Sequence, residues 1–225
     1  MMERIERYGA HAPKKQHGVL TAVLVVLAVL LAAMGIVSFL ALSDPYAGKG
    51  LENVSPSNQL PQTLAKETVL GREATFSESD VNGYLAYLFR EHLGSAQRSG
   101  VTPLAVAVAE ASGNSAELYL PVSYHGKRLG IALNVTPSID RNAGKLLFRV
   151  NSARVGRLSV PVDWLLSKAE SRLPKGFERD GSAVFCSVPA MQVKFGTVSA
   201  SAGLTTLHLS DGKLTLAAGA SVAIG

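Results

Sequence analysis

Cysteine and aromatic residues are scarce in this 225-residue chain, and each scarcity argues against a class of protein. Cys186 is the one cysteine, so no intramolecular disulfide can form and a small disulfide-stapled secreted module is excluded. Because Cys186 lies in an apolar run, we interpret it as a buried small hydrophobe and not as a nucleophile. Only 6% of the residues are aromatic, and no Lys/Arg cluster has aromatics between its members, which argues against nucleic acid as a partner.

Catalytic and metal-binding motifs are also missing from the sequence. The histidines are scattered, without HxxxH, HExxH or CxxC spacing, which predicts that the chain binds no metal ion and no cofactor. There is no GxSxG nucleophile motif and no glycine-rich phosphate loop. The sequence therefore predicts a protein that is not an enzyme and has no catalytic residues.

One long apolar segment is present. The 24 residues Val19–Leu42 carry no charge and include Leu24, Leu30 and Gly35. At ~1.5 Å per residue a helix of this length spans ~36 Å, enough to cross a ~30 Å hydrocarbon core. We expect a transmembrane signal anchor. A cleavable signal peptide is the alternative, but its apolar region is usually only ~7–15 residues long.

Charged residues on either side of this segment predict its orientation. Arg4, Arg7, Lys14 and Lys15 precede it, whereas Lys49 is the one basic residue among the first twenty that follow. Basic residues next to a span stay in the cytoplasm. We therefore expect a single-pass protein of a bacterial cell membrane, with the N-terminus in the cytoplasm and the C-terminal part in the cell envelope.

The expected organisation has four parts. Residues rich in Pro, Gly, Ser and Asn follow the anchor without any periodicity, which predicts a stalk. The 182 residues after Ser43 suit one domain, and their charges nearly balance. In chain order we expect a cytoplasmic basic tail (1–18), a transmembrane anchor (19–42), a stalk (43–61) and an extracytoplasmic domain (62–225).

Apolar spacing predicts the elements of this domain. A period of about 3.6 predicts one helix over about 78–93, opened by Ser77 and Asp80 in a capping-box arrangement, and a second over 161–173. Elsewhere the apolar period is two, which predicts about seven or eight mostly antiparallel strands, with a type I′ hairpin at Asp211-Gly212. The predicted fold class is α+β, a curved sheet with two helices.

The predicted strands present more apolar surface than two helices can cover. A helix ~10 Å wide covers roughly two strands that lie ~4.8 Å apart. Curling of the sheet, a partner protein or an apolar ligand could bury the rest, and composition does not choose between them. The candidate ligand-facing residues share the apolar phase of successive strands: Leu118, Leu120, Val122, Leu129, Ile131, Leu133 and Phe148.

Two short motifs resemble a known family. The string from Phe76 to Leu85, with Ser77 and Asn82, resembles the aromatic–Ser–acid–x–acid–aliphatic–Asn–x–x–Leu helix start of the YpmS-like family of bacterial membrane-anchored envelope proteins. Residues 155–161 resemble its small–Gly–x–Leu–x–aliphatic–Pro stretch. The resemblance covers about residues 70–220 and the anchor, and it implies no catalytic residue. Similar envelope proteins resemble the tubular lipid-binding superfamily, in which a long helix lies in a curled antiparallel sheet beside apolar ligands.

Two hypotheses of function follow from the sequence. In the first, the domain binds a lipid or another apolar ligand between the curved sheet and a helix. In the second, its apolar faces and sheet edges bind another envelope protein. The anchor favours the lipid hypothesis because it holds the apolar surface beside a bilayer. Asn82 has two readings, a polar residue in the first helical turn or a residue with a special role.

Overall fold

The computed structural model describes residues 16–92, 100–140, 145–170, 173, 176–187, 191–195 and 198–224. The chain divides into two compact units, Met1–Phe39 and Leu40–Gly225. The described part of the first unit is residues 16–39 of helix α1 (Gln16–Leu42). The window Val25–Leu42 of this helix has a mean hydropathy of 2.8. By length and composition this helix could cross a membrane, as the sequence predicts, although a signal sequence would meet the same criteria. The orientation residues Arg4, Arg7, Lys14 and Lys15 lie outside the described residues.

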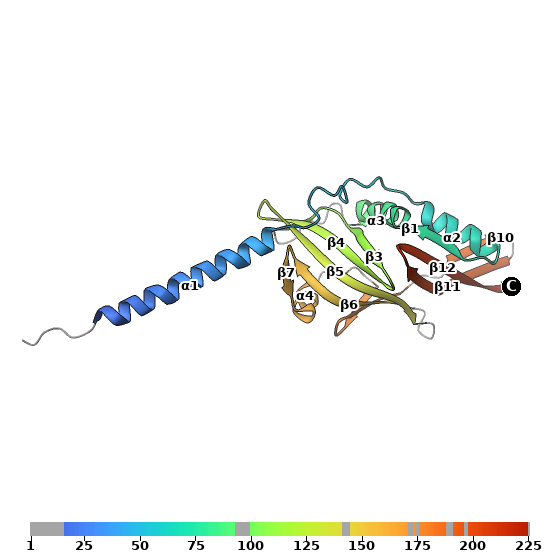
Figure 1. Cartoon of the computed structure of the whole chain (residues 1–225). Coiled ribbons are helices and arrows are strands. Elements are labelled where there is room, and N and C mark those ends of the chain that lie inside the picture. Colours follow the sequence, from blue (N-terminus) through green and yellow to red (C-terminus); the bar gives the residue numbers. More distant parts are fainter. Residues whose placement is uncertain are drawn as a thin grey trace, which may run out of the picture. The chain divides into compact units, whose positions relative to one another are not determined.

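In the second unit, the described residues form two antiparallel sheets and three helices (Figure 1). The larger sheet contains eight strands: β2 (Val101–Pro103), β3 (Ala107–Ser112), β4 (Ser115–Tyr124), β5 (Lys127–Asp140), β6 (Lys145–Val155), β7 (Leu158–Val160), β8 (Phe177–Asp180) and β9 (Ala183–Ser187). Its order is β2-β4-β5-β6-β9-β8, with β3 also on β4 and β7 also on β6. The smaller sheet has the order β1-β12-β11-β10: β1 (Ala74–Ser77), β12 (Lys213–Ile224), β11 (Val198–Ser210) and β10 (Met191–Phe195). The helices are α2 (Gln59–Val69), α3 (Glu78–His92) and α4 (Val162–Ala169).

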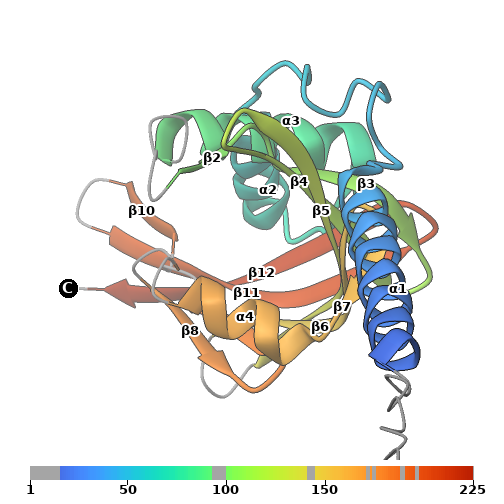
Figure 2. The same cartoon turned by 90° about the vertical axis from the view of Figure 1, so that its left-hand side faces the viewer.

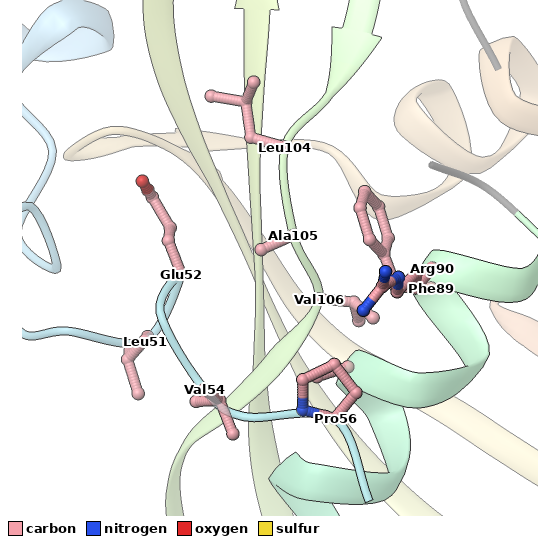
Figure 3. A pocket seen from close by; sticks show the side chains of 10 residues that line it. Leu51, Glu52, Val54, Pro56, Phe89, Arg90, Leu104, Ala105 and Val106 are labelled. Carbon is pink, nitrogen blue, oxygen red and sulfur yellow. The ribbon is translucent and has the colours of Figure 1, made fainter. Parts of the chain in front are cut away.

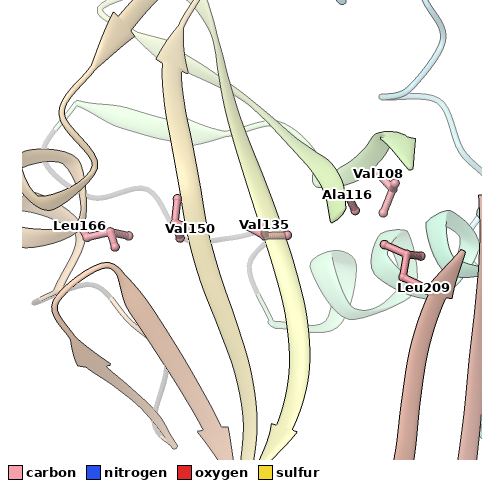
Figure 4. Packing of buried hydrophobic residues seen from close by; sticks show 6 residues of the cluster. All are labelled: Val108, Ala116, Val135, Val150, Leu166 and Leu209. Atoms are coloured by element: carbon pink, nitrogen blue, oxygen red, sulfur yellow. The ribbon is translucent and has the colours of Figure 1, made fainter. Parts of the chain in front are cut away.

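The predicted α+β class with a curved antiparallel sheet is confirmed, but the strands form two sheets instead of one. The larger sheet curls into a half-barrel, and β11 of the smaller sheet packs on its concave side (Figures 1 and 2). Leu209 of β11 and Leu166 of α4 join Val135 and Val150 of the larger sheet in one buried cluster (Figure 4). The apolar strand faces that two helices could not cover are thus covered in part by a second sheet.

Local sequence signals set the hairpins and the start of α3. Asp211 and Gly212 both have positive φ, 48° and 72°, which confirms the predicted type I′ turn. At Ser77 the hydroxyl donates to the Asp80 carboxylate at 2.6 Å and accepts from the Asp80 N–H at 3.2 Å. The Ser77 N–H also donates to this carboxylate, at 2.9 Å, so the predicted capping box is present. These bonds from Ser77 lower the pKa of Asp80.

The strand irregularity predicted near Arg154–Gly156 has a different form. The bulge lies at Asn151, where the register shifts opposite Asn134 and Val135. At Gly156, with φ +59°, the chain turns from β6 into β7, so the segment is a tight hairpin and not one long bent strand. The second predicted helix also begins one residue later, because Pro161 is its N-cap.

The segment predicted as a stalk packs on the domain. Tyr46 is only 7% exposed, in a cluster with Tyr119 and Ala132 of the larger sheet, and Leu51 packs beside it. The compact unit begins at Leu40, so the chain has no free linker over 43–61. Helix α2 starts inside this range, at Gln59, and buries Leu64. The polar composition of the segment did not predict this packing, because only a few of its aromatic and charged residues make the contacts.

Candidate functional site

The strand registers place all seven candidate ligand-facing residues on one face of the larger sheet. Leu118, Leu120 and Val122 of β4 lie opposite Leu133, Ile131 and Leu129 of β5 respectively. Phe148 of β6 lies opposite Pro137, which is two residues beyond Val135 on the same face. We call this the inner face, since it also carries Val135 and Val150 of the buried cluster.

The structure does not bring these seven residues into one cavity. Leu118 and Leu133 pack against the buried cluster around Val135, and Val122 is itself buried. Phe148 lies on the far side of that cluster from Ile131. Leu120, Leu129 and Ile131 lie on the other side of the cluster, towards the β4–β5 hairpin. The core thus divides the predicted apolar surface into separate parts.

On this hairpin side of the buried cluster, a row of half-buried aliphatic side chains crosses four strands. Leu120 of β4 pairs with Ile131 of β5, Ile131 with Val155 of β6, and Val155 with Leu158 of β7. None of the four belongs to a core cluster of the described residues, although each is half-buried. With strands ~4.8 Å apart, the row is ~14 Å long. We call Leu120, Ile131, Val155 and Leu158 the aliphatic row.

The row lies at the end of the sheet where the chain enters the domain. The N–H of Arg157 donates to the carbonyl of Leu40 at 2.8 Å, and the N–H of Gly156 donates to the carbonyl of Gly130 at 2.6 Å. Gly130 leaves no room for a side chain: a Cβ there would lie 2.6 Å from the Asp44 carboxyl carbon. We call this the entry end of the domain. Figure 2 views the domain from this side.

On the opposite, outer face, Arg128 holds residues 44–56, which we call the entry segment, through a polar cluster. Its guanidinium pairs with Asp44 at 3.4 Å and donates to Glu52 at 2.9 Å and to the Tyr119 hydroxyl at 2.8 Å. The Tyr119 hydroxyl in turn donates to Asp44, whose side chain is only 5% exposed. Burial and this hydrogen bond to Asp44 raise the pKa of Tyr119 to about 12.

A second cluster of polar side chains, next to the first, contains Tyr46, Glu117 and Arg154. The Tyr46 hydroxyl donates to Glu117 at 2.7 Å, and Arg154 forms an ion pair with Glu117. The rings of Tyr46 and Tyr119 contact each other, with centroids 5.2 Å apart. Burial and the bond to Glu117 raise the pKa of Tyr46 to about 12. We call these two groups together the entry clasp.

The sequence did not predict the entry clasp. Its strand members Glu117, Tyr119 and Arg154 lie on the polar phase of β4 and β6, where side chains are expected to be solvated. Their partners Asp44 and Tyr46 are over 70 residues away in the chain. The one available signal was a large aromatic, Tyr119, between two strand positions of the apolar face.

The motif residues Phe76, Ser77 and Asn82 have structural roles. Phe76 is 3% exposed and packs with Leu64 and Leu216, while Ser77 caps α3. Asn82 is 7% exposed and forms two hydrogen bonds with the main chain of Val108 in β3. Its role therefore exceeds that of an ordinary polar residue in a first helical turn, and it serves the packing of α3 on the sheet.

A small pocket lies between the entry segment and α3 (Figure 3). Its volume of about 160 Å³ is below the ~300–1,000 Å³ typical of small-molecule sites. It contains none of the seven candidate residues and is lined by Leu51, Glu52, Val54, Pro56, Ala86, Phe89, Arg90, Leu104, Ala105 and Val106. Within the described residues, no three His, Cys, Asp or Glu side chains are placed to hold a metal ion. Cys186 is half-buried, and burial raises the pKa of its thiol.

No family model, curated protein or solved structure matches this chain. The resemblance to the YpmS-like family therefore stays a prediction.

Proposed function

We propose that the chain is a membrane-anchored, non-catalytic domain that binds an acyl chain of a lipid along the aliphatic row. In this proposal α1 is the uncleaved anchor, its N-terminus is cytoplasmic and the domain lies in the bacterial envelope. The observation that carries the proposal is the row itself: four aliphatic residues at one sheet end, half-buried and outside the described core clusters.

The chemistry of the row suits an acyl chain. Leu120, Ile131, Val155 and Leu158 offer only aliphatic carbon to a ligand, so recognition would come from apolar burial. Each methylene removed from water contributes ~0.8 kcal/mol, so a few buried methylenes give useful affinity. The row is also long and narrow, ~14 Å across four strands, which suits an extended acyl chain better than a compact ligand.

The position of the row also supports a lipid. The entry clasp and the Arg157–Leu40 hydrogen bond hold the end of α1 at the entry end of the domain. If α1 is the anchor, no extended linker separates the row from the bilayer. An acyl chain could then pass from bilayer to row over a short path.

Photo-labelling of the full-length chain in proteoliposomes tests the proposal. A diazirine-bearing fatty acid is incorporated into the lipid, and labelled peptides are identified by mass spectrometry. We expect label in β4, β5 and β7 peptides around the row, in addition to α1, which any anchored helix would acquire. Label confined to α1 would overturn the proposal.

A pair of variants makes this test specific. Leu120→Phe should fill part of the row and lower labelling of the domain several-fold. Ser123→Phe places the same ring on the outer face and should leave the labelling unchanged. Equal labelling of both variants would count against the row. Failure of labelling together with a specific cross-link to another envelope protein would favour the interaction hypothesis.

A further inference from the structure

The entry end of the domain is fixed to the last turn of α1 by main-chain contacts. The carbonyl of Leu40 accepts from the N–H of Arg157, and the carbonyls of Leu40 and Ala41 lie where a Gly156 side chain would begin. Asp44, two residues after α1, contacts Arg128 in the β4–β5 hairpin. Two residues span at most ~7 Å. The Gly156–Arg157 turn and the β4–β5 hairpin thus lie within a short distance of the end of the apolar helix.

Among the described residues at this end, the exposed charges without a side-chain partner are basic. The exposed Asp163 of α4 pairs with Arg179 at 3.6 Å. The acidic residues Asp44, Glu52 and Glu117 are occupied by Arg128 and Arg154 in the entry clasp. Lys127 and Arg157 are exposed, and their side chains have no hydrogen-bond or ion-pair partner in the described part of the chain. A bilayer surface that contains anionic lipid attracts such residues by ~1 kcal/mol each.

Two large aromatic residues are exposed on elements of the same end. Tyr124, at the tip of β4, is 45% exposed and pairs with Lys127 across the hairpin. Trp164, on α4, is 54% exposed. Since Leu166 of α4 points into the core (Figure 4), Trp164 lies ~200° around the helix and faces away from it. Figure 2 shows α4 and the β4–β5 hairpin on this side of the domain.

We propose that this end of the domain docks onto the surface of an anionic bilayer, with Trp164 and Tyr124 in the interfacial layer and Lys127 and Arg157 against lipid phosphates. The proposal rests on the membrane anchorage in the proposed function, but not on the acyl chain in the row. Aromatic side chains with a polar tip prefer the interfacial layer, and basic side chains prefer phosphate. A polar partner protein would use the charges but would give no reason for two exposed aromatics beside the end of an apolar helix.

Trp164 provides the probe, because it is the single tryptophan of the chain. The full-length chain is reconstituted into vesicles of phosphatidylcholine and phosphatidylglycerol in equal parts, with or without bromine on the upper acyl carbons. We expect bromolipid to quench most of the Trp164 fluorescence and iodide in the solution to quench little. Unchanged emission with bromolipid and full quenching by iodide would overturn the proposal.

Matched variants separate docking from mere tethering. In a Trp164→Phe chain, Val69→Trp puts the reporter on α2, at the opposite end of the domain (Figure 1), and bromolipid should not quench it. The double variant Lys127→Gln/Arg157→Gln should reduce quenching of Trp164 several-fold in anionic vesicles and remove the difference between these vesicles and pure phosphatidylcholine. Equal quenching of both reporters, or no effect of the double variant, would contradict the proposal.

The two proposals can fail separately. Leu120→Phe should lower photo-labelling of the domain several-fold and leave Trp164 quenching intact. Failure of the chain to float with vesicles would instead overturn the anchorage on which both depend.

Discussion

Asn82 forms a two-way bridge to the main chain of Val108. Its side-chain amide donates to the Val108 carbonyl at 2.9 Å, and its carbonyl accepts from the Val108 N–H at 2.6 Å. Both residues are buried, so water cannot replace these bonds. The bridge fixes α3 to strand β3 of the larger sheet, 26 residues further along the chain.

Replacing Asn82 by Ala should destabilise the domain by about 3 kcal/mol, since two buried main-chain groups lose their partners. Asn82→Asp keeps the acceptor but removes the donor to the Val108 carbonyl, and should also destabilise. Guanidinium unfolding of the detergent-solubilised chain measures both. Asn58→Ala is the control, because Asn58 forms no cap hydrogen bond at α2 and should change stability by less than ~0.5 kcal/mol. Equal effects at the two positions would contradict the bridge.

Removing Arg128 from the entry clasp should expose the entry segment. Arg128→Met leaves the Asp44 carboxylate with only its bonds from Tyr119 and the Tyr46 N–H. Because Arg128 is 37% exposed, we expect a loss of about 2 kcal/mol, below the ~3–5 kcal/mol of a fully buried pair. Limited proteolysis should then cut the chain near residues 44–52 at a much higher rate. Lys127→Met, one residue earlier and without a side-chain partner in the described part, should leave that rate unchanged.

Gly156 should tolerate no side chain. Its φ of +59° costs an L-residue about 1 kcal/mol, and a Cβ would also collide with the carbonyls of Leu40 and Ala41. Gly113 has nearly the same φ, +56°, but open space around it. Gly156→Ala should therefore cost about 2 kcal/mol more than Gly113→Ala in the same unfolding assay. Similar costs would show that Gly156 matters only for its backbone angle.

High pH should weaken the entry clasp. Tyr46 and Tyr119 have pKa values raised to about 12 in the folded protein, against about 10 in an unfolded chain. A raised pKa means that the folded state retains the proton, so the stabilisation is complete below pH ~10 and is lost as the pH rises through about 12. The free energy of unfolding, measured against pH, should fall over this window. Tyr46→Phe and Tyr119→Phe should each flatten the fall, whereas the exposed Tyr124→Phe should not.

The sequence determined the features that depend on neighbouring residues. Helix α1, the capping box at Ser77 and the type I′ turn at Asp211-Gly212 follow from composition, spacing and turn chemistry within a few residues. The alternation in β4 and β5 likewise assigned Leu120 and Ile131 to one face of the sheet, because a strand's side chains point to opposite faces in turn.

Tertiary structure decided which of those elements pack against one another. Periodicity states which face of a strand is apolar but not which distant segment covers it. The sequence therefore did not predict that the second sheet covers Val135 or that Tyr46 packs on Tyr119. Asp44 and Tyr119 are 75 residues apart in the chain, and only the folded domain joins them. The same packing divided one predicted apolar surface into a core and an aliphatic row. The row lies where the chain enters the domain. Its members Val155 and Leu158 flank the Gly156–Arg157 turn, and the Arg157 N–H donates to the carbonyl of Leu40.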